Sequence, residues 1–221
     1  PLLSGMATFP MAGMILSTYL LRALPTTMSL LAQVLWWFSF LLDVCLILYF
    51  TTAYVFTKPR TSATPTWTVL YVGIAVAALT YPVVGIVEIA YGTLIFGFCL
   101  TLCLYPLIYQ DLKRNPLPIA LLGHEGIYCA PFSLLLAALV RVGGASLPSW
   151  ILLVMILTSQ TFFFFVLSRL PRILKHGFQP AFSALTFPTI ITATSLKMAQ
   201  GVLQIPILNL FVWLETFICL T

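Results

Sequence analysis

The sequence predicts an all-α polytopic membrane protein, and three observations support that prediction. Hydrophobic residues make up 61% of the 221 residues, whereas charged residues make up only 7%. A soluble domain carries about 25% charged residues, so this chain has too few charges to cover a water-exposed surface of its size. The apolar runs are about 20 residues long, as spanning helices require, and they do not alternate as the strands of a membrane barrel do.

Eight candidate spans follow one another along the chain. They cover residues 4–22, 29–56, 66–86, 89–110, 117–140, 149–170, 178–198 and 202–220. The segments between them are polar or rich in proline and glycine, such as TKPRTSATPT and RVGGASLPS. The breaks near Gly85, between the third and fourth spans, and near Gly201, between the seventh and eighth, are the least marked. We expect a single transmembrane domain over residues 1–221, within a longer polypeptide because Pro1 opens almost inside an apolar run.

The basic residues predict the orientation of these spans. Seven of the ten lie in the loops after the second, fourth and sixth spans: Lys58, Arg60, Lys113, Arg114, Arg169, Arg172 and Lys175. The remaining three, Arg22, Arg141 and Lys197, lie toward the other side. Cytoplasmic loops carry the excess of Lys and Arg, so these three loops are expected in the cytoplasm. We expect a multi-pass protein of the plasma membrane, or of the inner membrane in a bacterium.

A short motif repeats along the chain. Thr-Phe-Pro occurs at residues 8–10 and 186–188, and Thr-Tyr-Pro occurs at 80–82. Four prolines lie within the spans that run outward from the cytoplasm: Pro10, Pro82, Pro131 and Pro188. Proline removes a backbone hydrogen bond and kinks a helix, and in lipid the freed carbonyl needs a protein or water partner. We therefore expect four hairpins whose kinked outward helices surround a central pore, with straighter return helices outside. The alternative is that prolines are simply common in membrane helices.

The outward helices also carry the residues that we expect to line the pore. They are Thr8, Phe9, Thr80, Tyr81, Ser133 and Thr186. Hydroxyl groups line a path without binding an ion tightly, and a modest positive field and the pore diameter then give selectivity. The rings of Phe9 and Tyr81 either narrow this path or pack between helices.

Few ionisable residues lie inside the spans, where such groups are costly and often functional. Glu125 and His124 either line the cytoplasmic mouth, where they would couple transport to protons or ions, or form a local capped helix turn. Asp43 and Glu215 lie on return helices, so we expect them to make hydrogen bonds between helices.

No catalytic constellation is present, because the sequence has no GxSxG, HExxH or P-loop motif and only two histidines. We expect no enzymatic activity, no cofactor and no metal site. The five cysteines are expected to be buried small hydrophobic residues. The net charge of +5 is expected to report membrane topology rather than nucleic-acid binding.

Three segments together resemble the tellurite-resistance/dicarboxylate transporter family, which includes bacterial TehA and the plant slow anion channels. They are FQPAFSALTFPTIITATSLKMA, which is similar to the family's ninth helix, TPTWTVLYVGIAVAALTYPVVG and GIYCAPFSLLLAAL. The resemblance implies ten helices in five hairpins around a pore, so the chain corresponds to helices three to ten, with the first hairpin absent. It also implies a homotrimer in the lipid bilayer, and it gives Phe187 the role of the phenylalanine that plugs the pore.

We therefore expect transmembrane movement of a small inorganic or organic anion through a pore gated by Phe187. The chain would act as an anion channel or a channel-like exporter. A proton-coupled carrier for a C4-dicarboxylate or sulfite is the first alternative, with Glu125 or His124 taking up the proton. A membrane scaffold or receptor without a transported substrate is the second.

Overall fold

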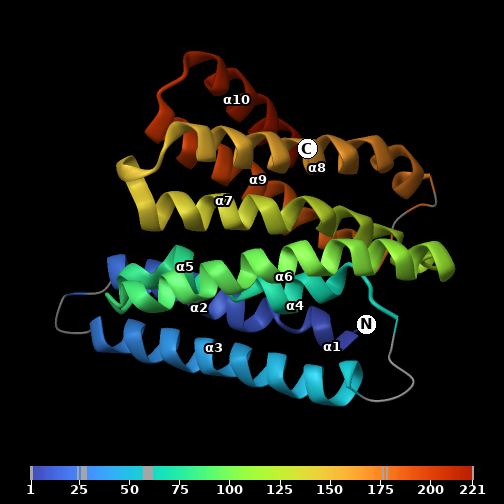
Figure 1. Ribbon diagram of the computed structural model, residues 1–221, viewed down its shortest axis with the longest axis horizontal. Coiled ribbons are helices and arrows are strands. Elements are labelled where there is room, and N and C mark those ends of the chain that lie inside the picture. The colour runs from blue at the N-terminus through green and yellow to red at the C-terminus, as the bar shows by residue number, and fades with distance from the viewer. Residues whose placement is uncertain are drawn as a thin grey trace. The chain divides into compact units, whose positions relative to one another are not determined.

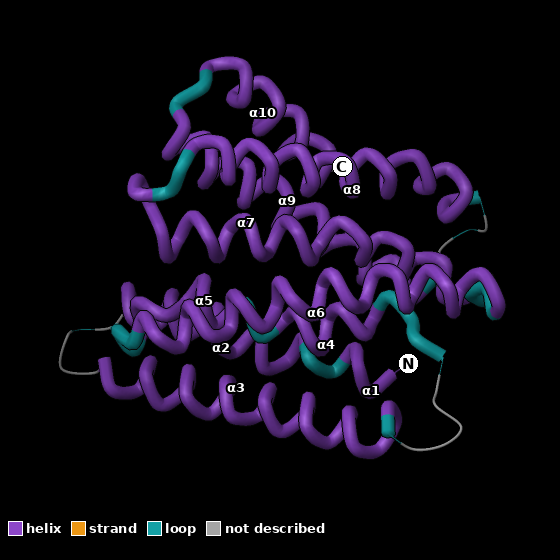
Figure 2. The backbone as a smooth tube through the Cα atoms, viewed as in Figure 1, coloured by secondary structure: helices purple, strands orange, loops and turns teal. Residues whose placement is uncertain are grey.

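The computed structural model describes residues 2–23, 25, 29–56, 62–175, 177 and 179–220, and Figures 1 and 2 trace them. Helices and the loops between them account for all of these residues, with no strand among them. Lys58 and Arg60, which contributed to the predicted orientation, lie outside the described residues. The chain divides into two compact units, residues 1–114 and residues 115–221.

The first unit holds the first four of the eight predicted spans, which form two hairpins. Its elements are α1 (Leu2–Gly5), α2 (Thr8–Ala23), α3 (Ser29–Phe50), the π-helical turn η2 (Thr51–Val55), α4 (Thr66–Gly73), α5 (Val76–Thr80), the 3₁₀ turn η3 (Tyr81–Val83) and α6 (Val87–Arg114). Two predicted outward spans are therefore broken here, the first between α1 and α2 and the other between α4 and α5.

The second unit begins with an unusual helix. Its elements are the 3₁₀-helix η4 (Ile119–Cys129), α7 (Ala130–Gly143), the 3₁₀ turn η5 (Gly144–Ser146), α8 (Ser149–Leu174), the 3₁₀ turn η6 (Pro180–Phe182), α9 (Ser183–Leu203) and α10 (Pro206–Leu220). A 3₁₀ run longer than three or four residues is uncommon, whereas η4 extends over 11 residues.

Each of the eight predicted spans coincides with a helix or a broken helix. Within the described part of the chain, four helical stretches are long and apolar enough to cross a membrane, namely 29–55, 87–114, 119–146 and 149–174. A fifth is added if α4 and α5, which are bent by 45°, form one span. The boundary between the last two spans differs most clearly, because α9 continues past Gly201 to Leu203. It ends at Gln204, whose left-handed backbone lets its N–H donate to the carbonyl of Gln200 at 2.7 Å.

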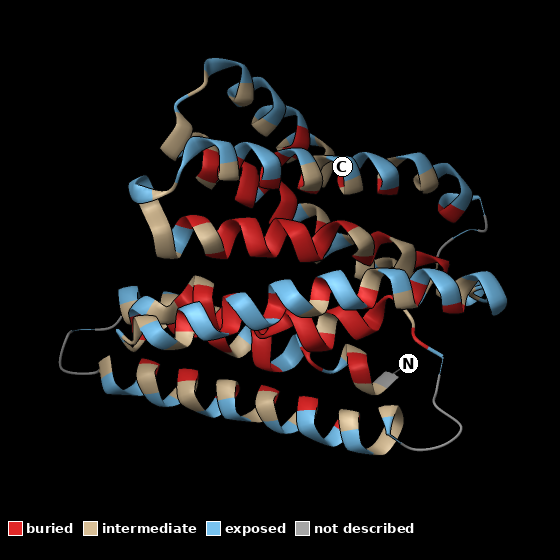
Figure 3. Ribbon diagram, viewed as in Figure 1, coloured by how far each residue is buried: buried red, intermediate tan, exposed pale blue. Residues whose placement is uncertain are grey.

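Burial separates the inner helices from the outer ones, as Figure 3 shows. About 72% of the apolar window around α7 is buried, against 28% to 33% for those of α3, α6 and α8. Nearly every residue of α4 and α5 is buried as well. The outward spans at 66–86 and 117–140 are therefore buried, and the return helices expose apolar side chains, as the hairpin pattern predicts. The other two outward helices, α2 and α9, differ, because they expose large side chains such as Phe9, Tyr19 and Ile190.

The expectation that all five cysteines are buried is wrong. Cys45, Cys99 and Cys103 are exposed, and only Cys129 is fully buried. The three exposed thiols lie on α3 and α6, whose apolar residues point outward as well as inward. In a membrane protein an apolar environment does not require burial against protein.

Glycines allow the helices of each unit to approach closely. A Cβ atom on Gly13 of α2 would overlap Ser39 of α3. In the second unit, Cβ atoms on Gly123 and Gly126 would overlap the backbone of Ala181 and the side chain of Leu185. Residues three apart share one face of a 3₁₀-helix, so η4 presents both glycines on one face, toward η6 and the start of α9.

We expect Gly123→Ala to destabilise the protein by about 1–3 kcal/mol, because the added methyl meets backbone atoms that cannot move aside. The midpoint of thermal unfolding in detergent measures the effect. Gly92→Ala is the matched control, because no atom lies within 4 Å of the position of its Cβ. The control should gain up to about 1 kcal/mol from helix propensity. Equal midpoints for the two variants would contradict the close contact at Gly123.

Candidate pore-facing residues and buried polar groups

Pro10 lies in the first turn of α2, directly after the break that separates α1 from α2. Because Pro10 has no N–H, it cannot donate to the carbonyl of Met6, four residues earlier. The N–H of Phe9 donates to that carbonyl instead, at 3.0 Å. The N–H of the residue before the proline therefore pairs with the carbonyl that the proline cannot serve.

Pro131 shows the same local arrangement in the second unit. It lies in the first turn of α7, directly after the 3₁₀-helix η4. The carbonyl four residues earlier belongs to Ile127, and the N–H of Ala130 donates to it. At Pro10 and Pro131 alike, the helix changes its hydrogen-bonding pattern where the proline enters.

The other two prolines lie in different settings. The bend of the third predicted span falls between Gly73 and Val76, where the N–H of Ala75 donates to the carbonyl of Val72 at 3.0 Å. Pro82 lies beyond the bend, in the terminal turn η3. Pro188 lies inside α9, which runs as one helix from Ser183 to Leu203. The four prolines therefore do not mark four equivalent breaks.

Two hydroxyls predicted to line the pore are buried inside their units. Thr80 is 2% exposed and accepts a hydrogen bond from Nε1 of Trp36 on α3 at 2.8 Å. Ser133 is fully buried, and its Oγ lies 2.8 Å from Oγ of Ser159 on α8 and 2.9 Å from Oγ1 of Thr192 on α9. In this structure both hydroxyls join an inner helix to its neighbours.

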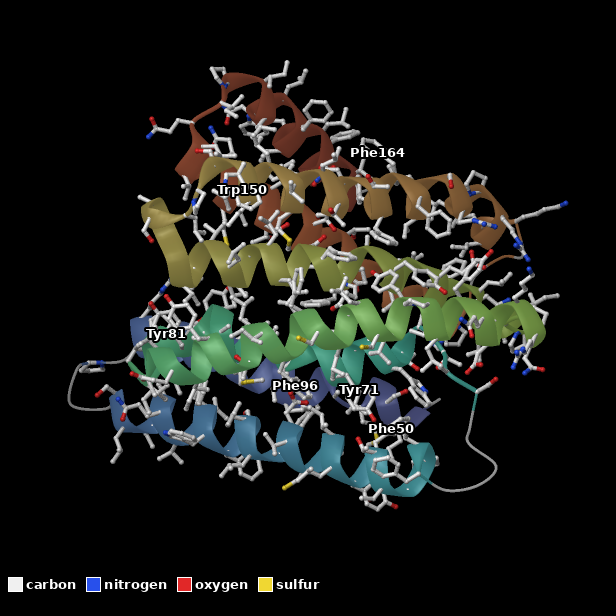
Figure 4. The ribbon with its side chains drawn as sticks, in the orientation of Figure 1. Phe50, Tyr71, Tyr81, Phe96, Trp150 and Phe164 are labelled. Atoms are coloured by element: carbon white, nitrogen blue, oxygen red, sulfur yellow. The ribbon has the colours of Figure 1, made fainter. Side chains whose placement is uncertain are left out.

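The remaining predicted pore residues have exposed or half-buried side chains. Thr8 and Phe9 are exposed at the start of α2, Phe9 to 70%. Tyr81 is half-buried in η3, at the end of α5 (Figure 4). Thr186 is exposed on α9, and Phe187 beside it is half-buried. Thr8 and Thr186 each donate to a backbone carbonyl three residues earlier, at 2.9 and 2.8 Å.

One face of α9 is exposed along its whole length and is mostly polar. We call the exposed residues of this face the α9 polar stripe: Ser183, Thr186, Ile190, Thr194 and Lys197. Their spacing of three and four residues places them in one row on the helix. Phe187 borders the row, and Pro188 behind it is buried. The outer helices differ, because their exposed faces carry large apolar side chains.

The ionisable pair Glu125 and His124 lies on η4. Both residues are half-buried, and Glu125 Oε2 and His124 Nδ1 are buried atoms without a hydrogen-bond partner in the described part of the chain. One turn further along η4, the ring of Tyr128 packs edge-on against Phe165, with centroids 5.9 Å apart. The guanidinium of Arg169 lies 5.1 Å from the centroid of the Phe165 ring. This end of the second unit therefore gathers one acid, one imidazole and one cation.

Sequence reasoning missed the polar partners on α8. Ser159 completes the hydroxyl cluster with Ser133, and Gln160 next to it has both amide atoms buried without a partner within the described residues. The signal is the polar run Thr158 to Thr161 within an otherwise apolar helix. No group of three potential metal ligands occurs in the ranges that the structure describes, and a metal-free protein stays a prediction.

Comparison with known proteins identifies the family of the chain. A search of curated proteins found no match. Residues 3–221 match the family described as voltage-dependent anion channel, and this match covers nearly the whole chain. With its apolar helices, this match makes the chain a multi-pass membrane protein of an anion channel or transporter class. The chain belongs to the voltage-dependent anion channel family.

Proposed function

We propose that the chain conducts small anions through a water-filled path along the α9 polar stripe, as a channel or channel-like exporter, with Phe187 as its gate. The α9 polar stripe carries this proposal. Outer helices of this chain expose leucine, phenylalanine and tryptophan, which suit lipid. A row that ends in Lys197 does not suit lipid, because ionisable groups in a membrane face the protein interior or a wet cavity.

The chemistry of the stripe suits passage rather than tight binding. The hydroxyls of Ser183 and Thr186 donate to carbonyls of their own chain, at 3.0 and 2.8 Å. An anion that accepts from either hydroxyl must first replace that bond, so the net gain is small. Lys197, about two turns beyond Ile190, adds a positive charge that attracts anions into the path.

Phe187 is placed to obstruct such a path. Its side chain borders the stripe between Ser183 and Ile190, and it is half-buried rather than locked in the core. Pro188 is buried directly behind it, which holds the adjacent backbone against the rest of the unit. Thr8, Phe9 and Tyr81, on helices of the first unit, remain predicted pore-lining residues.

A coupled carrier is the second candidate, and one observation favours it. Buried polar atoms without partners are costly, and Glu125 Oε2 and His124 Nδ1 are two such atoms on one turn of η4 in the described structure. A proton or an anionic substrate that binds there would satisfy them. A C4-dicarboxylate or sulfite carrier would use this turn for proton coupling.

We further propose the orientation and assembly that the sequence predicts. The N–H of Ala63, in the loop after α3, donates to Asp111 Oδ2 near the end of α6 at 2.7 Å. These two ends therefore lie on one side of the first unit, next to Lys113 and Arg114. This arrangement supports a cytoplasmic position for both loops. A homotrimer in the plasma membrane, formed of single transmembrane domains, is proposed on the resemblance alone.

We expect Phe187→Ala to raise anion conductance severalfold, because the substitution removes the ring that obstructs the path. Currents across a planar bilayer, with chloride and nitrate as permeant anions, measure the effect. Phe164→Ala is the matched control, because Phe164 is 48% exposed on the outer helix α8 (Figure 4). Unchanged currents in Phe187→Ala would remove the gate assignment.

Lys197→Gln should lower the ratio of anion to cation permeability, because it removes the positive charge of the α9 polar stripe. The effect should be larger at low ionic strength, because the Debye length, about 10 Å at 0.1 M salt, is then longer and the charge is screened less. Reversal potentials in asymmetric salt measure the ratio. Lys197→Arg keeps the charge and should keep the selectivity, whereas an unaltered ratio in Lys197→Gln would place Lys197 away from the path.

Flux into proteoliposomes separates the channel from the carrier. For the channel, we expect that a pH gradient alone drives no accumulation of malate or sulfite. A carrier would show accumulation that depends steeply on pH and loses that dependence in Glu125→Gln. Absence of flux for chloride, nitrate, sulfite and malate alike would instead support a protein without transport.

A further inference from the structure

One carboxyl group of the second unit lies apart from the proposed path. Glu215 is the only charged residue of α10, and it is 1% exposed although its neighbours Trp213, Leu214 and Phe217 are 48% to 75% exposed. The helix therefore turns its apolar side chains outward and its carboxyl inward. Neither oxygen of Glu215 has a hydrogen-bond partner among the residues that the structure describes.

A second side chain near Glu215 also has buried polar atoms that lack a hydrogen-bond partner among the described residues. The side chain of Gln160 on α8 lies close enough to the Glu215 carboxyl to influence it. Both Oε1 and Nε2 of Gln160 are buried and likewise lack a partner with hydrogen-bond geometry in the described ranges. Ile218 of α10 packs against a cluster that contains Cys129 of η4 and Phe163 of α8. α10 packs mainly against α9, and its inward side also meets η4 and α8 at this cluster.

The charges around Glu215 do not compensate an ionised carboxylate. Within the described residues, the ionisable groups that interact electrostatically with Glu215 are the thiols of Cys129 and Cys219, and neither is a cation. On α9 the ionisable residue is Lys197, which is exposed. On α8 the nearest cation along the helix is Arg169, nine residues from Gln160, or about 13 Å at 1.5 Å per residue. A buried carboxylate without a counter-charge is strongly disfavoured.

The two side chains are complementary only when the carboxyl is protonated. A carboxylic acid has one donor and one acceptor, and a primary amide has the same. They can form two parallel hydrogen bonds, from the acid O–H to the amide oxygen and from the amide N–H to the acid carbonyl. An ionised carboxylate accepts from the amide N–H but leaves the amide oxygen without a donor.

We propose that Glu215 and Gln160 form a proton-binding site in the interior of the second unit, which joins α10 to α8. The proton comes from water and resides on the Glu215 carboxyl, from which it is shared with Gln160 Oε1. Loss of this proton breaks one of the two hydrogen bonds and leaves a charge under α10. The packing of α10 therefore depends on pH. The site is independent of the path along α9, so its test does not depend on anion conduction.

The full chain in detergent tests this site through the pH dependence of its thermal unfolding. Proton binding favours the folded state, so this contribution is present at low pH and is lost as pH rises. We expect the midpoint temperature of unfolding to be lower at about pH 9 than at about pH 5. Glu215→Gln should reduce this fall, because two amides can form the same pair of hydrogen bonds without a titrating proton. Asp43→Asn is the control, because it removes a buried carboxyl of the first unit. This variant should retain the decrease in midpoint temperature that Glu215 causes.

Infrared spectroscopy gives a second readout that does not depend on stability. At neutral pH the protein should show the carbonyl stretch of a protonated carboxyl, which disappears in Glu215→Gln. Gln160→Leu should move this band to higher frequency, because the acid loses its hydrogen-bonding partner. An unchanged band in Glu215→Gln, or equal pH dependence in that variant and the unmodified chain, would overturn the proposal. Stabilisation by sodium at high pH, abolished in Glu215→Gln, would show a cation site instead and would also overturn it.

Discussion

The rest of the structure depends on one constraint, which is that a chain surrounded by lipid must satisfy its own polar groups. At Pro10 and Pro131 the helix loses a donor, and the preceding residue supplies a replacement N–H for the free carbonyl. Hydroxyl groups follow the same rule. Thr192 donates to the carbonyl of Pro188 at 2.8 Å, and Ser133 donates to that of Cys129 at 2.6 Å. Hydroxyls are therefore the polar groups that an apolar helix accommodates most easily.

This constraint also explains how the polar groups of the second unit are distributed. Hydroxyls occur both in the buried cluster of Ser133, Ser159 and Thr192 and on the exposed side of α9, because their own backbone satisfies them in either place. Carboxyl and amide groups have no such local partner. They require a neighbour on another helix, and where the neighbour is another amide or acid, the protonation state decides whether the pair is matched.

Hydropathy predicted the positions of the spans. The proline-containing spans at 66–86 and 117–140 are strongly buried, whereas α2 and α9 expose large side chains, so the proline pattern predicted the inner helices only in part. The sequence did not reveal where a span changes its helix type. The residues around Ile74 and Ala75 have no proline, so nothing marks the bend there, and the predicted bend at Pro82 was displaced. The composition of residues 119–129 does not distinguish a 3₁₀-helix from an α-helix, and the close contact of Gly123 with Ala181 is visible only in the structure. The partners of Thr80 and Ser133 are distant in sequence, so tertiary packing alone reveals them. The family resemblance, in contrast, was confirmed over residues 3–221.

The 3₁₀ form of η4 has a mechanical consequence for the length of its span. A 3₁₀-helix advances about 2.0 Å per residue and an α-helix about 1.5 Å. The 11 residues of η4 therefore reach about 22 Å, where an α-helix of the same residues would reach about 16 Å. A substitution that converts η4 to an α-helix would shorten this span by about one α-helical turn. It would also move Glu125 and His124, at the polar end of the unit, toward the centre of the membrane.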